Sequence, residues 1–304
     1  MTVDQKTLER IVREAISQNL AAAGKDPNHV SAPAVAPTNA ACDLPGALSL
    51  KRKLAAGQVS YGLWITLESP TLTEIAARLG FDWVVIDAEH GHLDLKVVME
   101  HVRVANLSGL TVLVRVADIQ QGVIKRVMDI GADGILVPQA RSADEIAEAV
   151  RYSKYPPEGV RGIGAERSTR WALGIEPCVR RANAQTLLIP LLETAEAGRD
   201  LTRILELPGV DALFLGPHDF AATSGFPGTS DHPEVTRRLD ALRGQARAAG
   251  KPLGIVAFSP DDIDRRRSQG FLMIGLGFDT GFFIRAARDA LERAGKPPPP
   301  TAWH

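Results

Sequence analysis

The feature that most constrains this chain is a regular alternation of apolar runs and helical patterns between residues 47 and 294. Most of the apolar runs are hydrophobic at nearly every position, as in strands that are buried on both faces. They span residues 60–66, 82–88, 111–116, 134–138, 186–192, 211–216, 252–258 and 271–276. Helical patterns lie between them at 71–79, 94–106, 120–130, 142–152, 196–206, 233–249 and 261–269, and a last one covers 281–294. Eight β/α units predict a (β/α)8 TIM barrel.

An open doubly wound sheet is the alternative architecture for the same alternation. It is disfavoured because no Gly-x-Gly-x-x-Gly turn follows the first strand. Outside the barrel, residues 1–22 contain an amphipathic helical pattern at 5–22, residues 23–46 resemble a flexible Ala/Pro linker, and residues 295–304 are predicted to be a disordered tail.

Charge and cysteine usage exclude several classes of function. The formal net charge of the 304 residues is -1, so the chain has no global attraction for nucleic acid or for an anionic membrane surface. No apolar run is long enough to span a membrane, and the N-terminus lacks the apolar region of a secretory signal. Only two cysteines are present, which offers no zinc cluster and favours a reducing cytoplasm.

Charged side chains gather where the predicted strands end, the rim that carries the chemistry of such barrels. They are Asp87, Glu89 and His90 after strand two, Arg115 in strand three, Glu193 after strand five, and His218 with Asp219 after strand six. Glu193 or Asp219 alone could simply cap the next helix. Several carboxylates buried together need a compensating cation, and hard oxygen ligands favour Mg²⁺ or Mn²⁺.

The sequence argues against three kinds of covalent catalysis. No lysine lies at the C-terminal end of a predicted strand, which argues against a Schiff base. Neither cysteine lies at a strand end, and a Gly-x-Ser-x-Gly elbow is absent from the sequence. His90 is therefore the natural proton carrier, and Asp87, three residues earlier, could orient its ring.

These residues lie in motifs that resemble the HpcH/HpaI aldolase family of metal-dependent pyruvate aldolases. The motifs are FDWVVIDAEHG, the arginine in VLVRV, KRVMDIGADGILVPQ, YPPEGVRGIG, the LLET end and LGPHDF, spread over residues 48–294. The resemblance implies an eight-stranded barrel whose last helix packs on, or swaps with, a neighbouring subunit in a hexamer or trimer of dimers. It implies a carbon–carbon lyase that cleaves a 4-hydroxy-2-oxo acid to pyruvate and an aldehyde.

The resemblance also assigns roles to individual residues. Glu193 and Asp219 would bind a divalent cation, Mg²⁺, Mn²⁺ or Co²⁺. Arg115 would contact the keto oxygen of pyruvate, and His90 with Asp87 would form the acid/base pair. Backbone amides of Gly216, Pro217, His218 and Asp219 would receive the pyruvate carboxylate. Trp64 and Gln139 would line the substrate pocket, although Trp64 could equally fill the barrel core, and Glu89 and Leu191 would border the cation ligands.

Two positions depart from the family pattern and leave the acceptor aldehyde open. Leu191 replaces a glutamine two residues before the cation-binding glutamate, and His218 replaces a small residue before the cation-binding aspartate. Two other functions compete with the aldolase: an acyl-CoA lyase of the malyl or citramalyl type, and a catalytically decayed barrel that serves as microcompartment cargo or scaffold.

The N-terminal helix has a separate interpretation. Its sequence, TLERIVREAISQNL, followed by an Ala/Pro linker, resembles peptides that dock enzymes into bacterial microcompartments. A short amphipathic helix is marginal alone and becomes stable when its apolar stripe is buried. The predicted partner is a shell or cargo protein, which would place a cytoplasmic enzyme inside a microcompartment. The alternative is a helix packed on its own barrel or oligomer.

Overall fold

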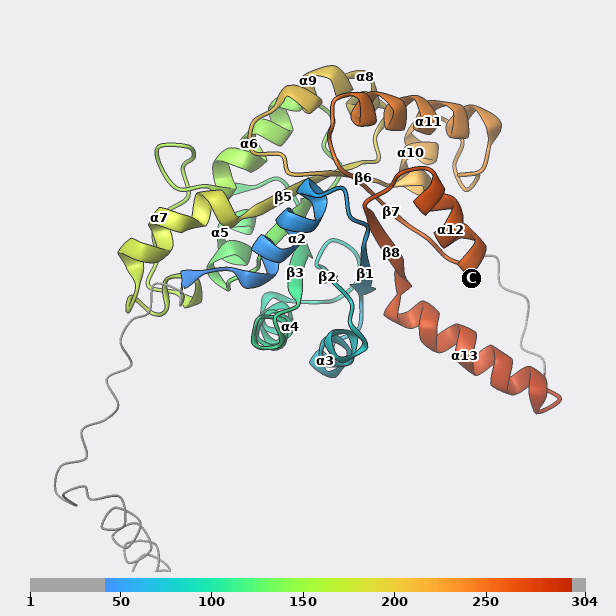
Figure 1. The fold of residues 1–304 in the computed structure, drawn as a ribbon, viewed down its shortest axis with the longest axis horizontal. Coiled ribbons are helices and arrows are strands. Elements are labelled where there is room, and N and C mark those ends of the chain that lie inside the picture. Colours follow the sequence, from blue (N-terminus) through green and yellow to red (C-terminus); the bar gives the residue numbers. More distant parts are fainter. Residues whose placement is uncertain (1–41, 297–304) are drawn as a thin grey trace, which may run out of the picture. The chain divides into compact units, whose positions relative to one another are not determined.

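Eight parallel strands form a closed barrel in the computed structural model, which describes residues 42–296 (Figure 1). Each strand pairs with the next along the chain, and β8 closes the barrel on β1. The strands are β1 (Ser60–Ile65), β2 (Trp83–Asp87), β3 (Thr111–Arg115), β4 (Gly134–Val137), β5 (Leu187–Leu192), β6 (Leu213–Leu215), β7 (Leu253–Val256) and β8 (Met273–Phe278). The predicted TIM barrel is confirmed, and the open sheet is excluded.

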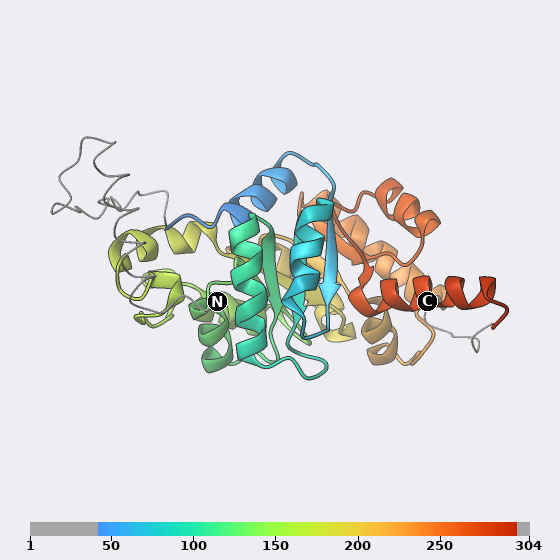
Figure 2. The ribbon, with the colours of Figure 1, turned by 90° about the horizontal axis from the view of Figure 1, so that it is seen from below.

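Helices surround the barrel, as Figures 1 and 2 show. They are α3 (Pro70–Leu79), α4 (Leu95–Ser108), α5 (Gln121–Asp129), α6 (Ala143–Ser153), α7 (Ile175–Gln185), α8 (Ala195–Arg199), α9 (Leu201–Glu206), α10 (Pro217–Thr223), α11 (Pro233–Ala248), α12 (Pro260–Ser268) and α13 (Asp279–Arg293). Side chains of Asp94, Ser142 and Ser259 accept a backbone N–H in the first turns of α4, α6 and α12. These caps satisfy donors that would otherwise have no partner, so polar residues in the sequence define several helix starts.

Two apolar layers hold the barrel together. The outer layer fills the space between strands and helices, and the inner layer lies inside the barrel. The inner layer includes Trp64, Leu113, Leu191 and Phe214, each buried. Because side chains alternate along a strand, a single fully apolar strand supplies both layers.

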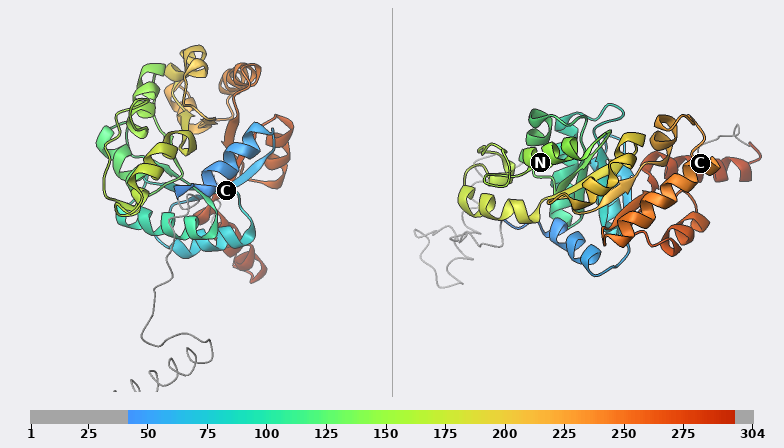
Figure 3. Two further views of the ribbon diagram at one scale, coloured as in Figure 1. Left: turned by 60° about the vertical axis from the view of Figure 1, so that its left-hand side comes forward. Right: turned by 90° about the horizontal axis from the view of Figure 1, so that it is seen from above.

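Helix α2 (Pro45–Ala55) closes the end of the barrel where the strands begin (Figures 2 and 3). Its buried face, formed by Ala47, Leu50 and Leu54, joins the inner layer. A side chain at Gly46 would lie 2.5 Å from the Asp133 carboxylate, so only glycine allows this approach. The sequence analysis did not predict α2, because the apolar pattern of one short helix is weak when its partner is the open end of a barrel.

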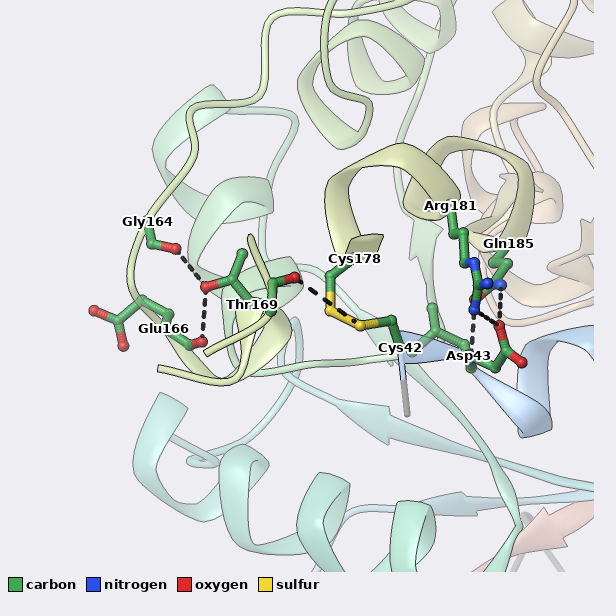
Figure 4. The surroundings of a disulfide bond; sticks show 10 residues. Cys42, Asp43, Gly164, Glu166, Thr169, Cys178, Arg181 and Gln185 are labelled. Atoms are coloured by element: carbon green, nitrogen blue, oxygen red, sulfur yellow. Dashed lines mark hydrogen bonds and ion pairs between the residues drawn. A yellow bond between two sulfur atoms is a disulfide. The ribbon is translucent and has the colours of Figure 1, made fainter. Parts of the chain in front are cut away.

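The chain before α2 is fixed to α7, as Figure 4 shows. Cys42 and Cys178 form a disulfide across 136 residues of sequence, with their Cα atoms 4.9 Å apart. Next to it, Arg181 pairs with Asp43 at 3.0 Å, and the amide of Gln185 donates to the same carboxylate. Residues 42–46, the last five of the predicted linker, are therefore held in place or belong to α2, while residues 1–41 lie outside the described part.

The long connection between α6 and α7, residues 154–174, is fixed by contacts with α4, α5 and the residue after α5. Arg161 is buried, pairs with Asp129 at 3.0 Å, and stacks its guanidinium 4.5 Å from the centre of the Tyr155 ring. The Arg167 guanidinium donates to the Asn106 side chain and to the Ile130 carbonyl. Arg161 and Arg167 therefore attach this connection to the neighbouring helices of the same chain.

The last helix, α13, leaves the barrel after β8 and projects from it (Figure 1). Phe282, Phe283 and Leu291 on this helix are exposed, and Phe283 keeps 73% of its surface accessible. No helix among residues 42–296 is long and apolar enough to cross a membrane. The predicted packing of the last helix on a neighbouring subunit stays a prediction, as does the tail at 297–304, which lies outside the described residues.

Candidate functional site

Arg115 is the central cation at the rim where the strands end. The β2–β3 register places Arg115 directly beside Asp87. Its Nε donates to Asp87 Oδ1 at 2.9 Å, its Nη2 donates to Asp87 Oδ2, and its Nη1 lies 2.9 Å from Glu89 Oε2. Burial by itself would lower the pKa of Arg115, but its hydrogen bonds to Asp87 and the charges of both carboxylates raise it. The guanidinium is thus a fixed, permanent charge.

Asp87 also shapes the turn that follows β2. Its Oδ1 accepts the backbone N–H groups of Glu89 at 3.1 Å and of His90 at 3.2 Å. His90 is exposed. Burial raises the pKa of the neighbouring Glu89, and the charges of Arg115 and His90 partly offset this effect. The Asp87 carboxylate is shared among Arg115 and this turn, and the acid/base pairing of Asp87 with the His90 ring stays a prediction.

Glu193 is not a helix cap. The hydroxyl of the next residue, Thr194, accepts the N–H of Ala197 and so caps α8. Glu193 is only 1% exposed, and its Oε1 accepts the backbone N–H of Gln139 at 2.7 Å. Gln139 reaches this position with φ of 52°, in the left-handed region that non-glycine residues rarely adopt. The Glu193 carboxylate therefore does not cap the start of α8, and it is held at the rim by the Gln139 backbone.

The pKa of Glu193 depends on burial and on the charged groups around it. Its pKa is raised to about 7, mainly by burial and in part by the charges of Glu89 and Asp219, against the opposing effects of the Gln139 N–H and of Arg115. Three carboxylates and one guanidinium therefore act on one another at this rim. Such a concentration of negative charge favours either a bound proton or a bound cation.

The turn between β6 and α10 approaches Glu193 closely. A side chain at Gly216 would lie 2.9 Å from Glu193 Oε2, so glycine is required there. The N–H of Gly216 donates to the Leu192 carbonyl at 3.2 Å, and Pro217 has no N–H. Of the four backbone positions predicted to receive a carboxylate, only His218 and Asp219, in the first turn of α10, have N–H groups left without an intrahelical partner; their contact with a substrate stays a prediction.

Glu193 and Asp219 fit a divalent cation by their chemistry. Carboxylate oxygens are hard ligands, and the excess negative charge around Glu193 is what a dication would neutralise. Within residues 42–296 no group of three or more His, Cys, Asp or Glu side chains is arranged as a complete metal site. The protein would thus supply two ligands, and substrate and water would supply the others.

Aromatic rings border the other side of the rim. Trp64 lies inside the barrel, with the Arg115 guanidinium 4.9 Å from its ring centre. Phe278, the last residue of β8, lies next to Trp64, and Phe258, just after β7, stacks on Phe278; neither residue was expected from the sequence. The signal that could have identified them is an aromatic residue at each of the last two strand ends, in a chain with only 5% aromatic residues. Leu191 is buried in the inner layer.

The model of one protein family matches most of the barrel. Residues 60–286 match the family described as HpcH/HpaI aldolase/citrate lyase. A solved structure, an HpcH/HpaI aldolase/citrate lyase family protein from Burkholderia cenocepacia, is similar with a TM-score of 0.78 and 32% identity, over 81% of this chain and 99% of that one.

Two curated relatives are similar over nearly their whole length. A 4-hydroxy-2-oxo-heptane-1,7-dioate aldolase from Shigella sonnei is 36% identical over 249 residues, which are 81% of this chain and 95% of the relative. A 4-hydroxy-2-oxovalerate aldolase from Rhodococcus jostii is 39% identical over 235 residues, which are 76% of this chain and 90% of the relative.

Proposed function

Because this chain belongs to the HpcH/HpaI aldolase/citrate lyase family, we propose that it reversibly cleaves a 4-hydroxy-2-oxo acid to pyruvate and an aldehyde. The observation that supports the proposal is that the charges of Asp219 and Arg115 both act on the buried carboxylate of Glu193 at the rim where the strands end. The relatives reported above are aldolases by name, which favours this reaction over cleavage of an acyl-CoA thioester.

In this proposal some residues stabilise negative charge and one residue transfers the proton. A divalent cation held by Glu193 and Asp219 would withdraw electrons from the keto group and make C3 of pyruvate more acidic. In the condensation direction, His90 takes a proton from C3, directly or through one water. Arg115 stabilises the negative charge that develops on the enolate oxygen. The enolate carbon then attacks the aldehyde carbonyl, and cleavage is the reverse of these steps.

Asp87 and Glu89 are positioning residues in this scheme. Together they hold the Arg115 guanidinium from two sides, so its direction is set before the substrate arrives. Mg²⁺, Mn²⁺ and Co²⁺ all accept carboxylate ligands, and we propose Mg²⁺ or Mn²⁺ as the physiological ion.

Exchange of the pyruvate methyl protons tests the proposal without an aldehyde. In deuterated water, the protein should exchange the C3 protons, and proton NMR should show the methyl signal disappear. Removal of divalent ions with EDTA should stop the exchange, since an unassisted C3 proton is too weakly acidic for a histidine base, and added Mg²⁺ or Mn²⁺ should restore it. Exchange that continues at full rate after complete metal removal contradicts the proposed function.

We propose two further properties of the intact enzyme. The exposed apolar side chains of α13 would pack on a neighbouring subunit in a hexamer or trimer of dimers. Residues 5–22, which lie outside the described part, would dock on a microcompartment shell or cargo protein. Deletion of residues 1–22 should leave turnover unchanged and abolish co-sedimentation with shell proteins. Loss of turnover and solubility in the deletion variant would instead identify an integral structural helix.

A further inference from the structure

Four rings form a continuous arc over one half of the rim, and we call them the aromatic arc: Trp64, Phe278, Phe258 and His218. The β1–β8 register makes Trp64 and Phe278 direct neighbours, with ring centres 5.7 Å apart. Phe278 and Phe258 stack at 6.3 Å with an angle of 18° between their planes, and Phe258 meets His218 edge to face at 6.4 Å. Each spacing lies within the range of favourable aromatic pairs.

The arc begins and ends beside the charged residues of the site. At one end the Trp64 ring lies under the Arg115 guanidinium. At the other end His218 immediately precedes Asp219 at the start of α10. The charged groups of the site thus come from β2, β3, β5 and α10, and the three arc rings other than His218 come from the ends of β1, β7 and β8. Among the described residues, the one buried carboxylate beside these ends, Asp279, is occupied by the N–H groups of Thr66 and Leu67.

The inner end of the arc is buried and holds a donor without a partner among the described residues. Trp64 is 3% exposed, and its Nε1–H has no hydrogen-bond partner in the described part of the chain. A side chain at Gly275 would lie 3.2 Å from this nitrogen, so glycine is what lets the indole occupy the space between β1 and β8. A buried donor of this kind is costly unless a ligand or water satisfies it.

We propose that the aromatic arc is the wall of the acceptor subsite, and that the enzyme prefers aldehydes with an aryl substituent over aldehydes with a second carboxylate. The proposal rests on the aldolase function proposed above. Pyruvate binds at the charged groups, and the aldehyde carbon that it attacks must lie next to it, which leaves the arc for the substituent. The middle of the arc consists of Phe258 and Phe278, whose rings attract a flat apolar group and offer no hydrogen bond to replace the water that a carboxylate loses.

A matched pair of aldehydes tests this preference. Succinic semialdehyde and 3-phenylpropanal have the same two-carbon spacer and differ only in a carboxylate or a phenyl group at its end. With saturating pyruvate, the wild-type enzyme should condense 3-phenylpropanal with a kcat/KM at least tenfold higher. An equal or reversed ratio overturns the proposal.

Two variants locate the preference in the arc. Phe258→Leu and Phe278→Leu should each reduce the ratio of the two kcat/KM values at least fivefold, because each removes one ring from the wall. Phe226→Leu is the matched control: its ring stacks on His232, outside the arc, and the ratio should not change. Unchanged ratios in both arc variants overturn the proposal.

Pyruvate exchange separates this proposal from the one on which it rests. If wild-type protein exchanges the C3 protons of pyruvate but favours succinic semialdehyde, the aldolase function stands and the arc is not the acceptor wall. If wild-type protein, loaded with divalent cation, neither exchanges these protons nor condenses either aldehyde, both proposals fail.

Discussion

Replacing Glu193 by glutamine is expected to abolish divalent-cation binding and to reduce aldol turnover by about a thousandfold or more. Glutamine keeps the size of the side chain and its contact with the Gln139 N–H, but it removes the charge that the cation needs. Loss of a catalytic dication forfeits several kcal/mol of transition-state stabilisation, and each 1.4 kcal/mol is about tenfold in rate. Isothermal titration with Mn²⁺ and a steady-state cleavage assay measure the two effects.

The wild-type protein supplies a pH signature for the same group. The pKa of Glu193 is about 7 in the cation-free fold, so a proton occupies the carboxylate below that pH and must leave before a cation binds. Cation affinity should therefore be highest above pH 7 and fall about tenfold per pH unit below it. The cation-free fold should lose stability as pH rises from about 5 to 7, because the unfolded chain holds fewer protons there.

A matched variant on the outer surface serves as control for both measurements. Glu196 lies on α8, where it pairs with Arg199 at 3.5 Å with both side chains largely exposed. Glu196→Gln should keep the cation affinity, its pH dependence and the turnover of the wild-type protein. Wild-type turnover in Glu193→Gln, or an affinity independent of pH between 5.5 and 7, would contradict the role given to Glu193.

Reduction of the Cys42–Cys178 disulfide is expected to lower the free energy of unfolding by about 3–5 kcal/mol, which corresponds to a fall in Tm of roughly 10 °C. The reason is entropic: the bridge closes a loop of 136 residues and so restricts the unfolded chain. Thermal unfolding with and without a phosphine reductant measures the difference, and mass spectrometry after alkylation counts the free thiols.

Serine variants provide the control for the disulfide. Cys42→Ser and Cys178→Ser should each unfold near the temperature of the reduced wild-type protein, and the reductant should not change either value. The Asp43–Arg181 pair and the Gln185 contacts remain in all three proteins, so they do not contribute to the difference. Equal unfolding temperatures for oxidised and reduced wild-type protein would show that the bridge does not restrict the unfolded chain.

Much of the fold could be predicted from local pattern. The eight strands begin and end within two residues of the predicted runs, because a strand buried on both faces leaves a continuous apolar signature. The candidate helix at 196–206 is two helices, α8 and α9, because the backbone of Asp200 leaves the helical region with a ψ of 11°; its carboxylate accepts the N–H of Ala143. Helix α10 was missed, because seven residues carry too little periodicity to be recognised.

The charged residues of the site could be named from the sequence because strand ends converge on one rim of any parallel barrel. The hydrogen-bond and ion-pair partners of these residues could not be predicted from the sequence. That Arg115 is held by both Asp87 and Glu89, and that Thr194 rather than Glu193 caps α8, follows from strand register and turn geometry.

The sequence by itself therefore determined the barrel, the family and the set of charged residues at its rim, since each depends on local periodicity or on motifs within a few residues. Only the tertiary structure decided the disulfide, the closure of the barrel by α2 and the aromatic arc. These features depend on contacts between residues that are far apart in the chain, as with Trp64 and Phe278 or with Cys42 and Cys178. Contacts of that kind leave no periodic trace, because they are set by the closure of β8 on β1 and by the packing that follows it.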